Sequence, residues 1–288
     1  MELCKSKVHK NEPTGEANVA ASPFDFILDG MVWSFTRVNA YATCPKMFKL
    51  SYIDCESKLQ NAFAEWGTLC HGVLEDYFNG KITLLDMAEA YNDRFGDVVK
   101  HNFPFKLREK YRESGEKFFD SFMGLPKGYA VLGVEQKVDL RFKGRPFVGY
   151  IDLLLRDESD GKIILVDHKS KSKFNTEAEK AHYLMQLYLY SQYVYEHYNQ
   201  YPKLLVFNMF RAGTVVTEEF HKEAFDSAVR WLNDTIDSIY RDVEFSDKIC
   251  LECMRKQTGD SFKHNDFFCN ELCSVRSHCE RSVLGEIP

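Results

Sequence analysis

Five short β-rich runs, broken once by a long helical run, restrict the fold of this chain more than any other feature. The β-rich runs span 131–142, 146–155, 162–169, 203–210 and 214–220, and the helical run spans roughly 177–199. Breaks such as Glu158-Ser159-Asp160-Gly161 separate them, because these residues favour turns. The order predicts an α/β class: a mixed central sheet flanked by helices, with helical additions.

Helical periodicity dominates the sequence before the first strand. We expect one helix over 34–55, entered through Ser34 or Thr36, a second from about Glu65, and more helix over 81–123. A last helix over 221–242 leads into a cysteine-rich end. The expected organisation is a flexible leader (1–24), a helical N-terminal region (25–125), an α/β core (126–245) and a cysteine-rich tail (246–288).

Composition excludes several classes of protein. The sequence contains no run of about 18 apolar residues, so we expect no transmembrane helix. The first 24 residues lack the apolar region of a secretion signal. The GxxxxGK[ST] motif is also absent, so we expect no NTP-driven motor. Nine cysteines without an export signal favour a reducing compartment, so we expect the cytoplasm of a bacterial, archaeal or phage-infected cell. A net charge of −6 argues against a protein that coats nucleic acid, yet it allows an acidic metal site beside a local basic groove.

The third β-rich run ends in Asp167-His168-Lys169, an unusual way to finish an apolar strand. Side chains alternate along a strand, so Asp167 and Lys169 should share one face and His168 the other. Asp152, in the preceding run, can approach Asp167 if the two strands pair through the turn near Asp160. Two carboxylates that close repel each other, and a divalent cation removes the repulsion.

His71, in a helical run, is a candidate third ligand, and the backbone carbonyl of His168 a fourth. Each residue also has an ordinary structural interpretation: a strand-edge aspartate, a hydrogen-bonded histidine, or a solvated lysine at a strand end. Glu135, on the first strand, is a candidate auxiliary acid, and a surface charge is at least as good an interpretation of it. The combination of residues, not any single one, favours a metal site.

Taken in order, these residues resemble a known family. Gly149-Tyr150-Ile151-Asp152, followed by Asp167-His168-Lys169, resembles the signature of the PD-(D/E)XK nuclease superfamily. Gln186 and Tyr190 lie at i, i+4 on the following helix and match the Q-x-x-x-Y motif of its RecB-like branch. His71 and Cys44 fall where RecB-like exonucleases and CRISPR-associated RecB-like nucleases have a metal-binding histidine and a first cluster cysteine. The acid before x-Lys is Asp167, where many members have Glu.

The resemblance implies a restriction-endonuclease-like core and a Mg²⁺ or Mn²⁺ ion held by His71, Asp152, Asp167 and the His168 carbonyl. It implies that Lys169 orients or activates water, and that Gln186 and Tyr190 position the scissile strand or support Lys169. The expected reaction is DNA hydrolysis, more on single strands or ends than at specific sites, leaving a 5′-phosphate. A helicase, a single-strand annealing protein or an integrase-type protein is the expected partner. The rival interpretation is a non-catalytic DNA-binding or scaffolding subunit.

The cysteines near the end have two interpretations. In RecB-like members with a 4Fe–4S cluster, one early cysteine joins three late ones, and Cys44 with Cys269, Cys273 and Cys279 fits that plan. Structural zinc is the alternative, because Cys250, Cys253, Cys269 and Cys273 have respectable zinc spacing. The iron–sulfur interpretation is modestly preferred.

Cations gather between 100 and 117. They are Lys100, Lys106, Arg108, Lys110, Arg112 and Lys117, with His101 among them, and Lys171 and Lys173 follow Lys169. Such stretches are usually solvated helix faces, and here they are also candidates to follow a phosphate backbone.

Overall fold

The computed structural model describes residues 22–245 and 267–279. Most of the expected leader (1–24), and Cys250 and Cys253 of the expected tail, lie outside these residues. The chain forms two compact units, each assembled from separate stretches. The sheet unit comprises Gln60–Leu140 and Val148–Val229, and the terminal unit combines the chain up to Leu59 with Arg141–Phe147 and the chain from Arg230 onward.

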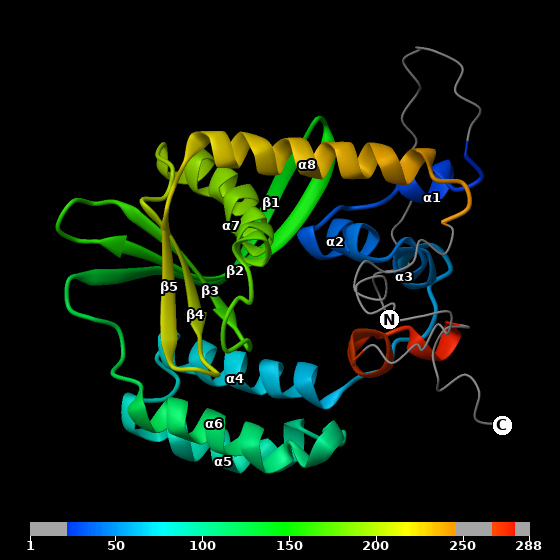
Figure 1. Ribbon diagram of the computed structural model, residues 1–288. Helices are drawn as coiled ribbons and strands as arrows, with labels where there is room; N and C mark the ends of the chain where they lie inside the picture. Colours follow the sequence, from blue (N-terminus) through cyan, green and yellow to red (C-terminus); the bar gives the residue numbers. More distant parts are fainter. Residues whose placement is uncertain (1–21, 246–266, 280–288) are drawn as a thin grey trace. The chain divides into compact units, whose positions relative to one another are not determined.

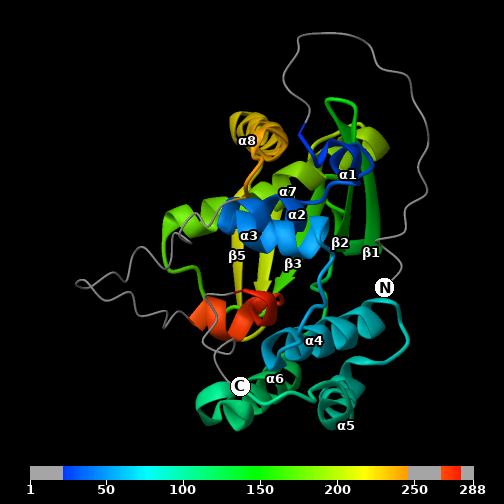
Figure 2. The ribbon, with the colours of Figure 1, turned by 90° about the vertical axis from the view of Figure 1, so that its right-hand side faces the viewer.

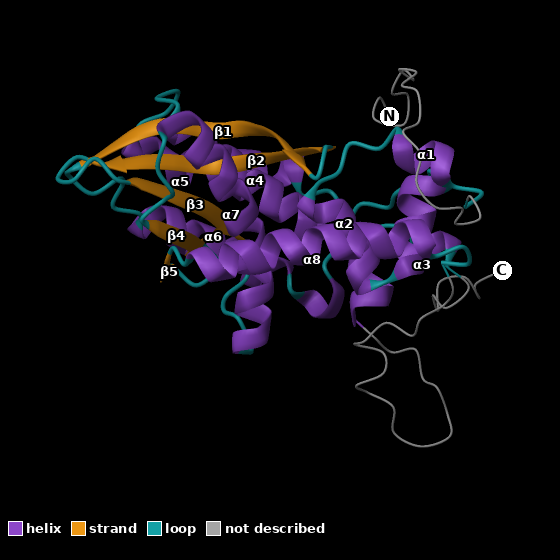
Figure 3. Cartoon of the chain, turned by 90° about the horizontal axis from the view of Figure 1, so that it is seen from above, coloured by secondary structure: helices purple, strands orange, loops and turns teal. Residues whose placement is uncertain are grey.

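A five-stranded sheet organises the sheet unit (Figure 1). Its strands are β1 (Tyr129–Phe142), β2 (Arg145–Asp157), β3 (Ile163–Lys169), β4 (Leu204–Met209) and β5 (Thr214–Glu219), and they lie side by side in chain order (Figure 3). Tight turns make β2–β3 and β4–β5 antiparallel. The β3–β4 pair is parallel, because helix α7 (Glu177–Tyr198) carries the chain back between them. Every strand expected from the sequence is present within two residues of its predicted bounds.

Helices pack on this sheet. One apolar cluster joins residues of β2, β3 and β4, such as Leu153, Val166 and Val206, to Phe78 of helix α4 (Ala62–Phe78). Helix α7 contacts β3 and β4. Helices α5 (Met87–Val98) and α6 (Arg108–Ser121) pack against each other, and α5 packs against α4 (Figure 2).

A buried aromatic cluster fixes α4 against its neighbours. Trp66 is fully buried, and its Nε1 donates to the hydroxyl of Tyr91 at 2.9 Å. Its ring meets Tyr111 edge-on at 4.9 Å between centroids. Rings of this size bury much apolar area, and the hydrogen bond satisfies the indole N–H that would otherwise be costly to bury. Helix α4, which carries His71, is therefore firmly positioned.

The terminal unit contains α1 (Asp25–Asp29), α2 (Phe35–Thr43), α3 (Pro45–Phe48), a π-helical turn (Lys49–Ile53) and most of α8 (Lys222–Arg241). Ser34 caps α2 as expected, accepting from the backbone N–H of Arg37 at 3.2 Å. The prediction of one helix over 34–55 is wrong: Cys44 is extended (φ −156°, ψ 108°) and Pro45 starts a new helix. The ring of Pro45 disfavours helical geometry at the residue before it.

The expectation of more helix over 81–123 is met by α5 and α6, which a connection at 99–107 separates. Among the residues that the structure describes, no helix combines the length and apolar character needed to cross a membrane.

Candidate functional site

The antiparallel pairing of β2 and β3 brings the two predicted aspartates together. Leu153 pairs with Val166, so Asp152 lies opposite Asp167 one step further along. The backbone N–H of His168 donates to Oδ2 of Asp152 at 2.6 Å. On β3, the side chains of Asp167 and Lys169 share a face as predicted: Lys169 Nζ lies 2.7 Å from Asp167 Oδ2.

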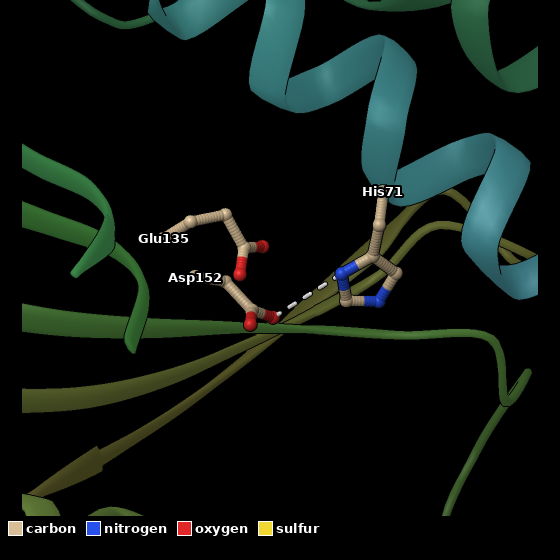
Figure 4. Close-up of side chains that lie close together, drawn as sticks. All are labelled: His71, Glu135 and Asp152. Carbon is tan, nitrogen blue, oxygen red and sulfur yellow. Dashed lines mark ion pairs between the residues drawn. The ribbon is translucent and has the colours of Figure 1, made fainter. Parts of the chain in front are cut away.

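Three side chains from different elements converge beside this pair (Figure 4). His71 of α4, Glu135 of β1 and Asp152 of β2 each present a ligand atom within 4.8 Å of the other two. Nδ1 of His71 lies 3.6 Å from Oδ2 of Asp152. One imidazole and two carboxylates form a donor set that suits a divalent cation such as Mg²⁺ or Mn²⁺.

Glu135 enters this group through an unusual backbone conformation. Its φ is 48°, in the left-handed region, although it lies inside β1. Such a conformation costs of order 1–3 kcal/mol for a residue with a side chain, and it persists only when the surroundings enforce it. The buried–exposed alternation of β1 is clean only from Lys137 onward. The sequence singled out Glu135 only as an auxiliary acid, and the structure brings it to the centre.

Asp167, in contrast, does not belong to that set of three. Its Oδ2 is buried and, within the described residues, accepts no hydrogen bond. The 2.7 Å contact with Lys169 is therefore an ion pair that lacks hydrogen-bond geometry. A buried carboxylate oxygen without a hydrogen-bond donor is costly. The ammonium group of Lys169 supplies the compensating positive charge.

The electrostatics of the group point the same way. Burial, followed by the charge of Asp167, raises the pKa of Asp152 to about 8. Burial also raises the pKa of Glu135, with the charges of Glu75 and Asp167 adding to it. Burial lowers the pKa of His71, which favours the neutral imidazole that ligates metals. Glu135 and Asp152 are therefore acids that are costly to ionise unless a cation is bound beside them. The residues present fit a divalent ion.

A row of polar contacts links Lys169 to helix α7. Lys169 Nζ donates to Oε1 of Gln186 at 3.3 Å, and Nε2 of Gln186 donates to the hydroxyl of Tyr190 at 3.2 Å. The ring of Tyr190 packs on Gly149, where any Cβ would overlap it. Tyr190 therefore contacts both segments that the sequence indicated. It accepts from Gln186 of the Q-x-x-x-Y motif and packs on Gly149, three residues before Asp152.

His168 projects to the other face of β3. Its ring is buried and stacks on Phe78 at 6.2 Å between centroids, and it meets His71 edge-on at 5.8 Å. Nδ1 of His168 lies 3.0 Å from Nδ2 of Asn208. Burial lowers the pKa of His168 to about 3, so the imidazole is neutral. A hydrogen bond with the backbone of His168 raises the pKa of His71, against the larger lowering effect of burial.

A second group of candidate ligands lies in the terminal unit. Cys44, Cys269, Cys273 and Cys279 line one cavity, together with Met47, Leu50, Phe268, Val275 and Arg276. Burial raises the pKa of Cys273, and the neighbouring Cys44 and Cys279 raise it further. Four thiols around one largely apolar cavity fit the donor set of an iron–sulfur cluster. Cys250 and Cys253 of the alternative zinc set lie outside the described residues.

One family of known proteins matches most of this chain. The family model described as "PD-(D/E)XK nuclease superfamily" matches residues 32–280. None of the curated proteins matches this sequence. A solved structure similar to this one is a "putative exonuclease" from Eubacterium rectale, 9% identical, with a TM-score of 0.44 over 86% of this chain and 96% of the other. The expected mixed sheet with flanking helices is confirmed, and the chain belongs to the PD-(D/E)XK nuclease superfamily.

Proposed function

We propose that this protein is a metal-dependent deoxyribonuclease that acts on single-stranded DNA or DNA ends in recombination, repair or phage DNA processing. One observation carries the proposal: His71, Glu135 and Asp152 converge beside the Asp167–Lys169 pair. Acids crowded and buried to this degree resist ionisation in the absence of a cation. A purely structural role would gain nothing from that arrangement.

Each residue of the site has a distinct task in this proposal. His71, Glu135 and Asp152 hold the cation, with Asp167 and the His168 carbonyl completing its surroundings. When bound, a Mg²⁺ or Mn²⁺ ion polarises the phosphodiester and makes a water more acidic. Lys169, whose ammonium group lies beside Asp167, would orient the water or stabilise charge that develops on the phosphate.

Gln186 and Tyr190 act through Lys169. The Gln186 amide accepts from the ammonium group and donates to the Tyr190 hydroxyl, which fixes the amide orientation. Burial raises the pKa of Tyr190 to about 12, so its hydroxyl remains protonated at neutral pH. We therefore assign Gln186 and Tyr190 as positioning residues that hold Lys169 in place.

Action on ends rests on the resemblance to the RecB-like branch and on the lack of a recognisable sequence-reading module. Digestion of DNA labelled at either end distinguishes the modes of cleavage. A ladder that shortens progressively from one terminus supports an exonuclease, and discrete internal fragments contradict it.

The test of catalysis compares wild type with Asp167→Ala and Lys169→Ala on labelled DNA in Mg²⁺ or Mn²⁺. We expect both variants to cleave far more slowly than wild type. Equal activity in all three proteins overturns the assignment of the site. DNA binding without cleavage by any of them favours the rival, a non-catalytic subunit of a recombination or integration complex.

We also propose that Cys44, Cys269, Cys273 and Cys279 hold a 4Fe–4S cluster. Support comes from the single cavity that the four thiols line. A cluster there would join segments far apart in the chain. Protein purified without oxygen should be brown, with a broad visible absorption that Cys44→Ser abolishes. Colourless protein with stoichiometric zinc contradicts the cluster and favours the zinc set that includes Cys250 and Cys253.

A further inference from the structure

The connection between α5 and α6 (99–107) contains two adjacent residues in the left-handed conformation. Phe105 has a φ of 54° and Lys106 a φ of 56°. Neither is glycine, and bulky residues rarely adopt this region because the Cβ crowds the backbone. Two neighbouring residues in this conformation strain the backbone locally. Such strain persists only where the surrounding contacts stabilise the conformation.

Contacts on both sides hold this connection in place. Oε2 of Glu65, on α4, accepts from the backbone N–H groups of Lys100 and His101, both at 2.9 Å. Oε1 of Glu65 lies 2.6 Å from Nδ1 of His101. Phe103 is 7% exposed and stacks on Tyr111 at 4.7 Å between centroids. The part of the connection that leads into the strained turn is therefore held against α4 and α6.

What the turn displays is a single aromatic ring. Phe105 is 80% exposed, although the preceding Phe103 is buried. Six lysines and arginines occur between 100 and 117 against three glutamates, whereas the whole chain carries −6. All of these cations except Arg108 are exposed, namely Lys100, Lys106, Lys110, Arg112 and Lys117. An exposed ring next to Lys106, in a segment rich in exposed cations, suits single-stranded nucleic acid, whose bases stack on aromatic rings and whose phosphates bind cations.

The turn also lies close to the metal site along the same helix. Glu65, which anchors the turn, and His71 are both on α4, and at 1.5 Å per residue they are about 9 Å apart along the axis. Figure 1 shows the α5–α6 connection at the N-terminal end of α4. A stacked strand advances about 3.4 Å per nucleotide, so the separation of Glu65 and His71 along α4 alone spans about three nucleotides.

We propose that Phe105 is a base-stacking residue for single-stranded DNA, and that Lys106 and its exposed neighbours bind the flanking phosphates. The strained turn presents the ring to an unpaired base of a strand that also reaches the metal site. The inference rests on the proposed function, because it takes DNA as the substrate.

The test measures binding of a fluorescently labelled oligo-dT by anisotropy, with EDTA present so that no metal-dependent cleavage occurs. Phe105→Ala should weaken binding about tenfold, the size of a lost base–aromatic stack. Phe105→Trp should restore it, because stacking is regained. The matched controls are Leu85→Ala and Met123→Ala, which remove apolar side chains that are 91% and 87% exposed. They should bind as wild type does.

Unchanged affinity in Phe105→Ala overturns the inference, and so does an equal loss in Leu85→Ala or Met123→Ala. Full affinity in Phe105→Leu also overturns it, because leucine cannot stack as an aromatic ring does. A thermal melt of each variant establishes that it is folded. Cleavage by wild type in Mn²⁺ is measured separately: its absence defeats the proposed function, while the binding comparison still decides the role of Phe105.

Discussion

Asp152 interacts with more of the charged and polar groups of the site than its neighbours do. It lies opposite Asp167, accepts from the backbone N–H of His168, and lies 3.6 Å from His71. Its side chain is only 13% exposed, so water does little to screen the neighbouring charge of Asp167. A carboxylate in this setting is costly to ionise, and a cation is the group that reverses the cost.

The stability of the metal-free protein should therefore depend on pH through Asp152. Its pKa in the fold, about 8, is above the ordinary value of 3.8, so between these values the folded state holds the proton more tightly than the unfolded state. The stabilisation is complete below pH 4 and is lost as pH rises toward 8. Urea unfolding in EDTA at pH 5 and pH 8 should show a larger loss of stability in wild type than in Asp152→Asn.

Added Mn²⁺ should reverse that loss in wild type only, because a bound cation favours the ionised carboxylate. An identical pH dependence in wild type and Asp152→Asn would show that this carboxyl group is not the source.

Removal of the Lys169 side chain should act on the reaction itself. Lys169→Ala should lower kcat about a hundredfold or more, the usual cost of losing one group that stabilises developing charge. The proposed ligands His71, Glu135 and Asp152 remain in place, so Mn²⁺ affinity should change much less than the rate. Gln186→Ala, which removes only the support of the ammonium group, should lower kcat by a smaller factor. Single-turnover cleavage and metal titration on the same samples separate these effects.

At the scale of elements, the site depends on how closely α7 approaches β2. The ring of Tyr190 occupies the space in which a side chain at position 149 would begin. Gly149 is therefore needed for close packing of α7 on β2. Because Gly149 precedes Asp152 by three residues, this packing also fixes where Asp152 lies relative to the helix that supports Lys169. Close packing of this kind tolerates no added methyl group without movement.

Gly149→Ala should accordingly destabilise the fold by about 1–3 kcal/mol and lower activity, because α7 must move away from β2. Gly96→Ala, on the surface of α5 with open space around the new methyl, is the matched control. It should be neutral or slightly stabilising, since alanine favours the helix more than glycine does. Chemical denaturation measures both, and an unperturbed Gly149→Ala variant would contradict the described packing.

At the scale of the whole molecule, the order and type of the central elements follow from the sequence, because alternation and turn residues act locally. The β3 pattern and the turn at Asp160 were enough to predict that Asp152 and Asp167 approach each other. The break at Cys44 is also local, and its signal was Pro45. The gathering of four cysteines in the terminal unit agrees with the set that the family resemblance indicated.

Two features of the site could not be read from local pattern. Glu135 reaches His71 and Asp152 through a left-handed residue inside a strand, a conformation that tertiary packing imposes and that period-two alternation cannot indicate. Asp167 lies beside the group formed by His71, Glu135 and Asp152, and one of its oxygens is 2.7 Å from the Lys169 ammonium. Both outcomes depend on distances between elements that are far apart in the chain.

The central claim is that His71, Glu135 and Asp152 share one divalent cation, and direct titration of Mn²⁺ into purified protein tests it. Calorimetry should show a site in wild type whose affinity falls at least tenfold in His71→Ala, Glu135→Gln and Asp152→Asn, as loss of a ligand requires. Asp139→Asn, an exposed acid on the same strand as Glu135, should bind as wild type does. Equal affinity in wild type and all three ligand variants would contradict the account.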